Sequence, residues 1–226
     1  SNGLGDKQLA WLKSDLQSAK ENSNIKWTIV SMHKGLYSAG SHSYDSEVIA
    51  LRGQLSSIFY DYGVDLVLQG HDHVYNTTGF LDRFGNNVTV RTDGDNTIQK
   101  PQGVMYITLG TMGNKYYEYR ENELVTPIIK DSMTHIGQLS TQTYSTLTFK
   151  NDKLTITNNM IGDDKFPISL TIDKSANVTA GTAVDLKSIK LAGIAIENNS
   201  KILANAETTI SYLTIARNDY GSNVKI

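Results

Sequence analysis

Residues 64–75 read VDLVLQGHDHVY. The first six form a short, mainly apolar run typical of a buried strand, and the glycine that follows marks the turn at which such a strand ends. Two histidines, His71 and His73, stand two residues apart in this turn. Neutral imidazole is the commonest protein ligand for transition metals. The stretch therefore predicts a strand end that carries metal ligands, on a rigid edge that fixes both rings.

A second stretch of the same kind lies upstream. Residues 27–32 (WTIVSM) form another candidate strand, and His33 follows them directly. Between the two runs lies one apolar stripe with helical spacing, made of Val48, Leu51, Leu55, Ile58, Phe59 and Tyr62, with Gly63 at the position of a C-cap. Strand–helix–strand with short connections predicts parallel strands and a right-handed crossover. Both strands then end at the same edge of the sheet, where α/β proteins bind ligands, so we expect His33 and His71 to lie close together.

The rest of the chain adds mostly strands, and the fold class expected is α/β. Asp6 is a plausible N-cap of a first helix, and residues 115–143 are expected to be loop with a short helix. After about residue 174 the composition shifts to Ala, Asn, Ser, Thr and Ile, which favours a small β-rich segment. The expected units are therefore residues 1–174 and 175–226. The remaining strand candidates are 78–80, 88–91, 104–109, 146–150, 154–157 and 168–172, with a hairpin turn at 151–153 and a turn at Asp93-Gly94.

Composition excludes several classes of function. The chain has 226 residues, 39% of them hydrophobic and 19% charged, so a packed core is expected. The net charge of −2 gives no basic excess for nucleic acid as main partner, and the lack of cysteine excludes disulfides and thiolate chemistry. No apolar run approaches the ~20 residues that span a membrane. The start Ser1-Asn2-Gly3 has no initiator Met and is interpreted as a cleavage scar on an excised fragment.

The other candidate residues allow two interpretations each. His42 lies in a Gly/Ser loop. It is interpreted either as an exposed loop residue or as a general acid near the metal ligands. Side chains alternate along an extended segment, so His71 and His73 should face one side. Asp72, between them, should point to the other side, where it is interpreted as a structural or supporting residue. Tyr75 is interpreted as a packed or hydrogen-bonded wall. Residues 110–114 either line the site or form an ordinary turn, and His135 is expected to be exposed.

These stretches resemble the last two motifs of the calcineurin-like metallophosphoesterases, and most closely the purple acid phosphatase branch. The likeness extends over roughly residues 4–173. It is carried by residues 30–33 (VSMH), 36–38 (LYS), His42 and 70–75 (GHDHVY), with further landmarks at 8–12 (QLAWL) and 106–110 (YITLG). The resemblance implies the C-terminal half of a metallophosphoesterase-type α/β sandwich.

The resemblance also implies a chemistry and roles for individual residues. By position, His33 and His71 would bind one metal of a dinuclear pair and His73 the other. His42 would contact the substrate phosphate as a catalytic residue, and Tyr75 would line the substrate-binding site. The implied reaction is hydrolysis of a small-molecule phosphate ester, with zinc, iron or manganese ions that lower the pKa of bound water and clamp the reacting oxygens. An extracellular or cell-surface location is expected.

The departures from the family pattern are large. The earlier motifs Asp-x-His, Gly-Asp-x-x-Asp and Gly-Asn-His, which supply the bridging carboxylate and further ligands, are absent from the 226 residues. Asn76-Thr77 also stands where the branch has Glu-Arg. The chain alone is therefore expected to be a weak metal binder and a poor catalyst.

Two alternatives stay open. One is a non-catalytic extracellular or cell-surface binding module with a degenerate metal site. The other is a mononuclear zinc hydrolase that uses His33, His71 and His73, since three histidines with an open position suit zinc. The sequence leaves the substrate, the metal and the oligomeric state open.

Overall fold

The computed structural model describes residues 3–91, 97–118, 133–137, 140–161, 163–174, 195–196 and 224–225. The chain divides into two compact units, 1–180 and 181–226. In the second unit, the described strands β11 (Ala195–Ile196) and β12 (Val224–Lys225) pair in antiparallel fashion. The boundary expected near residue 174 stays a prediction, because residues 175–194 lie outside the described part of the chain.

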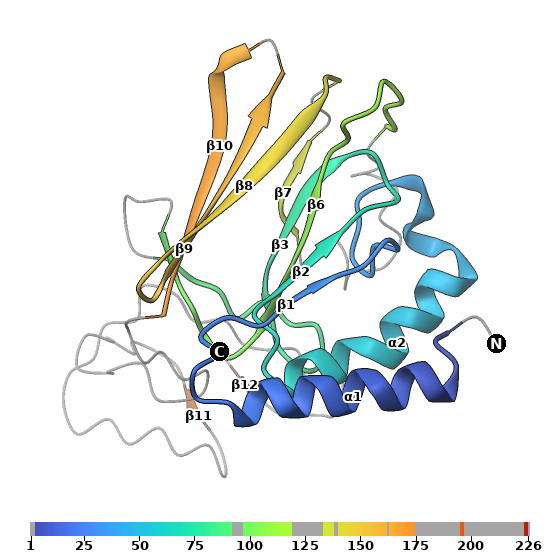
Figure 1. Cartoon of the computed structure of the whole chain (residues 1–226), viewed down its shortest axis with the longest axis vertical. Helices are drawn as coiled ribbons and strands as arrows, with labels where there is room; N and C mark the ends of the chain where they lie inside the picture. Colours follow the sequence, from blue (N-terminus) through green and yellow to red (C-terminus); the bar gives the residue numbers. More distant parts are fainter. Residues whose placement is uncertain are drawn as a thin grey trace. The chain divides into compact units, whose positions relative to one another are not determined.

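A five-stranded sheet forms the middle layer of the first unit (Figure 1). In spatial order its strands are β1 (Ile29–Ser31), β2 (Leu66–Gln69), β6 (Val104–Leu109), β3 (Tyr75–Leu81) and β7 (Met133–Gly137). The parallel pairing predicted for the first two strands, β1 and β2, is confirmed. Strand β6 is also parallel to β2, and β3 runs antiparallel between β6 and β7.

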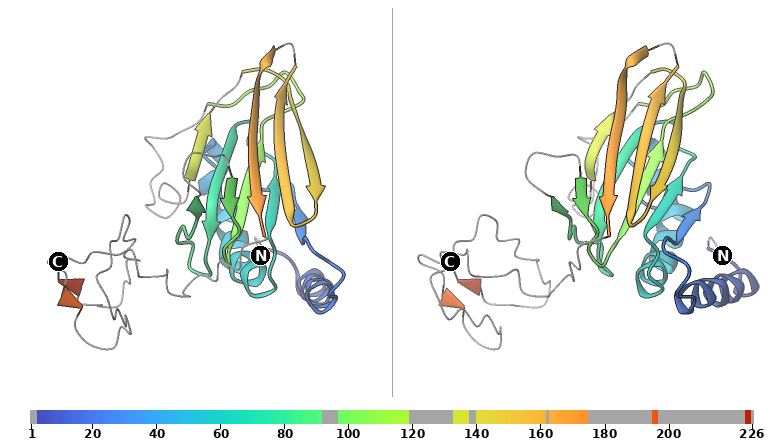
Figure 2. Two further views of the ribbon diagram at one scale, coloured as in Figure 1. Left: turned by 90° about the vertical axis from the view of Figure 1, so that its left-hand side faces the viewer. Right: turned by 60° about the vertical axis from the view of Figure 1, so that its left-hand side comes forward.

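Two helices cover one face of this sheet and a second sheet covers the other. Helices α1 (Asp6–Glu21) and α2 (Ser46–Asp61) share a core with the first sheet. Figure 2, turned so that the second sheet comes forward, shows α2 behind the sheets and α1 beside their lower end. The second sheet contains, in order, β4 (Val90–Arg91), β5 (Thr97–Gln99), β10 (Asp163–Asp173), β9 (Lys153–Met160) and β8 (Thr143–Lys150).

Strand β6 shows why the first sheet needs a layer on each side. Tyr106 packs with the helices, whereas Met105 and Ile107 pack with Leu154 and Ile156 of the second sheet. Alternate residues of a strand point to opposite faces, so an apolar strand such as β6 exposes hydrophobic surface unless both faces are covered. The result is the α/β sandwich expected from the sequence.

Several details differ from the sequence expectations. Gly5, rather than Asp6, is the N-cap of α1, and it makes no side-chain cap hydrogen bond. Asp6 is the first helical residue, where its negative charge favours the helix N-terminus. Within the segment 115–143, expected to be loop and short helix, the structure has strand β7, which is paired to β3. The turn expected at Asp93-Gly94 lies outside the described residues.

Neither of the described helices α1 and α2 is long and apolar enough to cross a membrane.

A buried ion cluster lies just before the start of β2. Lys174 Nζ lies 2.8 Å from Asp65 Oδ2, and Lys100 Nζ lies 3.5 Å from Oδ1 of the same carboxylate. The Thr28 backbone N–H also donates to Asp65, at 2.9 Å. Burial lowers the pKa of Lys100 to about 8, although the Asp65 charge opposes the shift. The cluster joins the ends of β5 and β10 to the first sheet, at the end opposite the histidines.

Candidate metal centre

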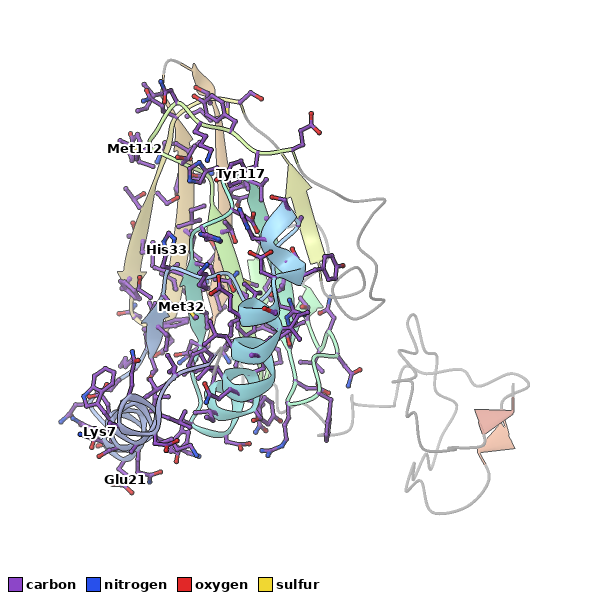
Figure 3. All side chains as sticks on the ribbon, turned by 90° about the vertical axis from the view of Figure 1, so that its right-hand side faces the viewer. Lys7, Glu21, Met32, His33, Met112 and Tyr117 are labelled. Carbon is purple, nitrogen blue, oxygen red and sulfur yellow. The ribbon has the colours of Figure 1, made fainter. Side chains whose placement is uncertain are left out.

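His33 and His71 meet at the carboxyl ends of β1 and β2. Pairing continues past both strands, since Met32 N–H donates to Leu68 O at 3.0 Å and Gly70 N–H to His33 O at 3.1 Å. This pairing places His33 Nε2 3.0 Å from His71 Nδ1. Figure 3 shows His33 just past Met32, toward the same end as Tyr117, with Lys7 and Glu21 of α1 far below. The structure thus brings together two residues that are 38 positions apart in sequence.

The backbone at His71 is not extended, so the extended conformation assumed for residues 71–73 is wrong. His71 has φ 71°, in the left-handed region, which turns its ring toward His33 and His42. His73 instead stacks on Tyr117, with ring centres 4.7 Å apart. Its Nδ1–H donates to Lys115 O at 2.6 Å, which leaves the lone pair on Nε2 and orients the ring as the backbone does for many metal-bound histidines.

His42 reaches the same place from the loop between β1 and α2. It lies in a short 3-10 turn, Ser41–Tyr44, and its ring centre is 4.2 Å from that of His71. Its Nδ1 lies 2.9 Å from Asp45 Oδ2. Asp45 is the N-cap residue of α2, yet its carboxylate makes no cap hydrogen bond to the helix. That carboxylate is therefore directed to the site.

The carboxylate of Asp72 holds the His42 loop against the histidine turn. It accepts a hydrogen bond from Ser38 Oγ at 2.6 Å and one from the His42 backbone N–H at 3.3 Å. Ser38 is 0% and Asp72 2% exposed, so the bond between them is shielded from water. Gly40 approaches so closely that a Cβ there would lie 2.3 Å from Asp72 Cγ. The supporting role expected for Asp72 is confirmed by these contacts.

Positive charges surround His71 on its other side. Lys34 Nζ lies 3.3 Å from His71 Nε2 and also forms an ion pair with Glu47. Burial lowers the pKa of His71, and Coulomb interactions with His42, Lys34 and His33 lower it further, against the opposing Asp72 carboxylate. The neutral ring that results is the form that binds metal.

Tyr75 lies deeper than the histidines. It is 4% exposed within β3, and burial raises the pKa of its hydroxyl to about 12. The hydroxyl is therefore neutral near pH 7, and the residue is a buried part of the wall. Gly110, with φ 80°, begins the turn that leads to Lys115, whose carbonyl contacts His73. The side chain of His135, expected to be exposed, lies outside the described residues.

The side chains at this edge fit a borderline metal ion. The ligand atoms of His42, Asp45 and His71 all lie within 4.8 Å of one another. Two nitrogens that share a tetrahedral zinc at about 2.0–2.1 Å are about 3.3 Å apart, close to the separation of the facing His33 and His71 nitrogens. Imidazole and carboxylate donors suit zinc, iron and manganese. Four residues around these histidines were not predicted from the sequence: Asp45, Lys34, Glu47 and Tyr117. Of these, only Asp45 has a position that could have indicated its role, because it stands three residues after His42 and just before the apolar helical stripe.

Comparison with known proteins shows which proteins this chain resembles. Residues 2–75 match the family model "Calcineurin-like phosphoesterase". The chain is 33% identical over 107 residues to purple acid phosphatase 23 of Arabidopsis thaliana (47% of this chain, 20% of the relative). It is 30% identical over 181 residues to an acid phosphatase of Aspergillus ficuum (77% of this chain, 28% of the relative). A further relative, 31% identical over 114 residues (50% of this chain, 24% of the relative), is Fe(3+)-Zn(2+) purple acid phosphatase 12 of Arabidopsis thaliana.

A solved structure gives the same result for the fold. Purple acid phosphatase PPD1 from yellow lupin seeds superposes with a TM-score of 0.56 at 20% identity, over 75% of this chain and 28% of that protein. The resemblance to calcineurin-like phosphoesterases, and to purple acid phosphatases in particular, is confirmed, as is the α/β fold class. The chain spans 20% and 28% of the length of the first two relatives.

Proposed function

We propose that this chain contributes to the hydrolysis of small-molecule phosphate esters. The observation that carries the proposal is the meeting of His33 and His71 at one sheet edge, with their ring nitrogens 3.0 Å apart and His42 beside them. The phosphatase relatives support the same reaction class.

In the proposed centre, His33 and His71 hold one metal ion and His73 holds a second. When bound, the two ions lower the pKa of water and clamp the attacking and leaving oxygens. The Asp-x-His, Gly-Asp-x-x-Asp and Gly-Asn-His motifs are absent from this sequence. We therefore propose that a longer protein supplies the bridging carboxylate and remaining ligands, and that the 226-residue chain alone is a weak catalyst.

His42 is the proposed catalytic residue of this chain. Its Nδ1 is held by Asp45, which directs Nε2 away from that carboxylate and leaves it to give a proton to a phosphate or leaving-group oxygen. Asp45 is the positioning residue in this arrangement, since its contact with Nδ1 fixes the orientation of the His42 ring. Tyr75 supports the substrate side of the site as a buried wall.

The metals proposed are zinc, iron or manganese, all of which accept imidazole and carboxylate ligands. The name of one relative, Fe(3+)-Zn(2+) purple acid phosphatase 12, supports a mixed pair. We also propose an extracellular or cell-surface location, which is tested by fractionating cells and probing each fraction with an antibody to this chain.

The experiment compares the 226-residue chain, the full gene product and its His71→Ala variant. Phosphomonoester hydrolysis is assayed after adding zinc, manganese or iron, with Lys13→Ala on the exposed face of α1 as a matched control. We expect an active gene product, loss of activity in His71→Ala, unchanged activity in Lys13→Ala and a weak isolated chain. An active gene product unaffected by His71→Ala would overturn the ligand assignment. A full gene product that is inactive with every metal would favour a non-catalytic binding module. Full activity in the isolated 226-residue chain would favour mononuclear zinc chemistry.

A further inference from the structure

A second set of potential ligands overlaps the first. His42, Asp45 and His71 present ligand atoms that all lie within 4.8 Å of one another, although they come from two separate segments. His42 lies in the 3-10 turn that precedes α2, Asp45 is the N-cap of α2, and His71 lies in the turn after β2. This set shares only His71 with the proposed catalytic ligands His33, His71 and His73.

The donors in this set match a zinc site. Two imidazoles and one carboxylate with an open fourth position are a known zinc ligand set. His42 Nδ1 and Asp45 Oδ2 are already 2.9 Å apart, close to the separation of about 3.3 Å between two ligands of a tetrahedral zinc. Asp45 and His42 are partly exposed, with 41% and 32% of their side chains accessible. An ion can therefore enter from solvent, and both side chains can turn to close on it.

The set is also held in place by groups that do not themselves belong to it. Asp72 accepts a hydrogen bond from the His42 backbone N–H and stands next to His71 in the chain, so one buried carboxylate couples the two segments. Arg52 of α2 donates to Ser43 O at 2.7 Å, which ties the 3-10 turn to the helix that begins after Asp45. The Asp45 carboxylate makes no cap hydrogen bond with α2, so metal binding costs the helix no cap.

We propose that His42, Asp45 and His71 form a zinc site of this chain that overlaps the ligand set His33, His71 and His73 only at His71. The site uses only residues of the 226-residue chain and needs no ligand from elsewhere. Because both sets draw on His71, an ion held by one set competes with an ion at the other. An ion there also engages His42, so excess zinc is expected to block the position at which that residue meets a phosphate group.

The test measures Zn²⁺ binding to the 226-residue chain by competition with a chromophoric chelator. We expect one zinc per chain, and an affinity that falls by about tenfold or more in His42→Gln and in Asp45→Asn, since loss of a direct ligand should exceed the cost of losing an outer partner. His73→Gln discriminates between the two sets, and we expect it to change the affinity less than threefold. Asp15→Asn, on an exposed part of α1, controls for a simple change in net charge.

A second measurement guards against misfolded variants. Long-range ¹H–¹⁵N spectra of the unmodified chain should show zinc-induced shifts of the His42 and His71 ring nitrogens and little change at His73. Zinc binding that resists both His42→Gln and Asp45→Asn would overturn the proposal. So would zinc binding that depends on His73, or spectra in which the His42 ring does not respond, or a chain that takes up no zinc.

Discussion

Ser38 and Asp72 form a buried hydrogen bond of 2.6 Å that joins the loop after β1 to the turn after β2. Ser38 is 0% exposed and Asp72 2%, so water cannot replace the hydroxyl once it is removed. Ser38→Ala should therefore lower the free energy of unfolding by about 1–3 kcal/mol. Ser18→Ala, which removes an exposed hydroxyl bonded to Ser14 O on α1, should change it by no more than about 0.5 kcal/mol. Urea unfolding of both variants checks this, and equal losses would contradict it.

Gly40 and Gly53 should respond to alanine in opposite directions. A Cβ at Gly40 would lie 2.3 Å from Asp72 Cγ, so Gly40→Ala should displace the His42 loop and lower the free energy of unfolding by about 1–3 kcal/mol. Gly53 lies within α2 and has open space around a Cβ, so Gly53→Ala should raise stability by about 0.5–1 kcal/mol. Thermal unfolding of the two variants measures the difference, and a stabilised Gly40→Ala would contradict the close approach.

Lys100 should make stability depend on pH in the alkaline range. Its pKa falls from 10.5 to about 8 on folding, so the unfolded chain holds the proton more tightly between these values. Stability from this residue therefore rises as pH increases from 8 to 10.5, with a slope of at most about 1.4 kcal/mol per pH unit. The difference in unfolding free energy between Lys100→Met and the parent chain should change over this range and be flat from pH 6 to 7. Parallel curves throughout would show that Lys100 titrates normally.

Lys34 should weaken metal binding at His71. Its ammonium lies 3.3 Å from His71 Nε2, and removing it also frees the Glu47 carboxylate from its ion pair. Lys34→Met should therefore raise the zinc affinity of the chain by about fivefold, which corresponds to about 1 kcal/mol, the repulsion of two unit charges about 4 Å apart in water. Lys20→Met is the matched control, because the Lys20 ammonium, in the last turn of α1, contacts the backbone oxygen of Asp61 at the end of α2. The gain in zinc affinity should shrink in high salt, because salt screens the repulsion between Lys34 and the ion. Equal zinc affinities of Lys34→Met and the parent chain in low salt would contradict this repulsion.

The sequence predicted the elements that follow local rules. The spacing of Val48, Leu51, Leu55 and Ile58 predicted α2, and Gly63, with φ 74°, ends it as expected of glycine after a helix. The expected strand 104–109 matches β6 in both bounds. The meeting of His33 and His71 was also predictable, because parallel strands joined by a helix share one carboxyl edge.

The parts that sequence did not predict depend on contacts between distant segments. Strand β7 exists through its pairing with β3, which no local pattern in residues 133–137 announces. The left-handed backbone of His71 contradicts the extended His-x-His segment assumed from the sequence, because the conformation of this turn depends on the fold around it. Tyr117, stacked on His73 from 44 residues downstream, carries no sequence signal of its role.

The backbone at His71 also restricts which residues can take its place. A side chain at φ 71° meets a steric penalty of about 1–2 kcal/mol that glycine escapes and asparagine tolerates better than most. Two requirements therefore act on this position: an imidazole side chain for metal binding, and a residue that tolerates a left-handed backbone. Replacement by valine or isoleucine should harm the fold even where metal is irrelevant. A lineage that gave up metal chemistry should therefore drift at this position toward glycine or asparagine, and such drift would record the lost function in the sequence.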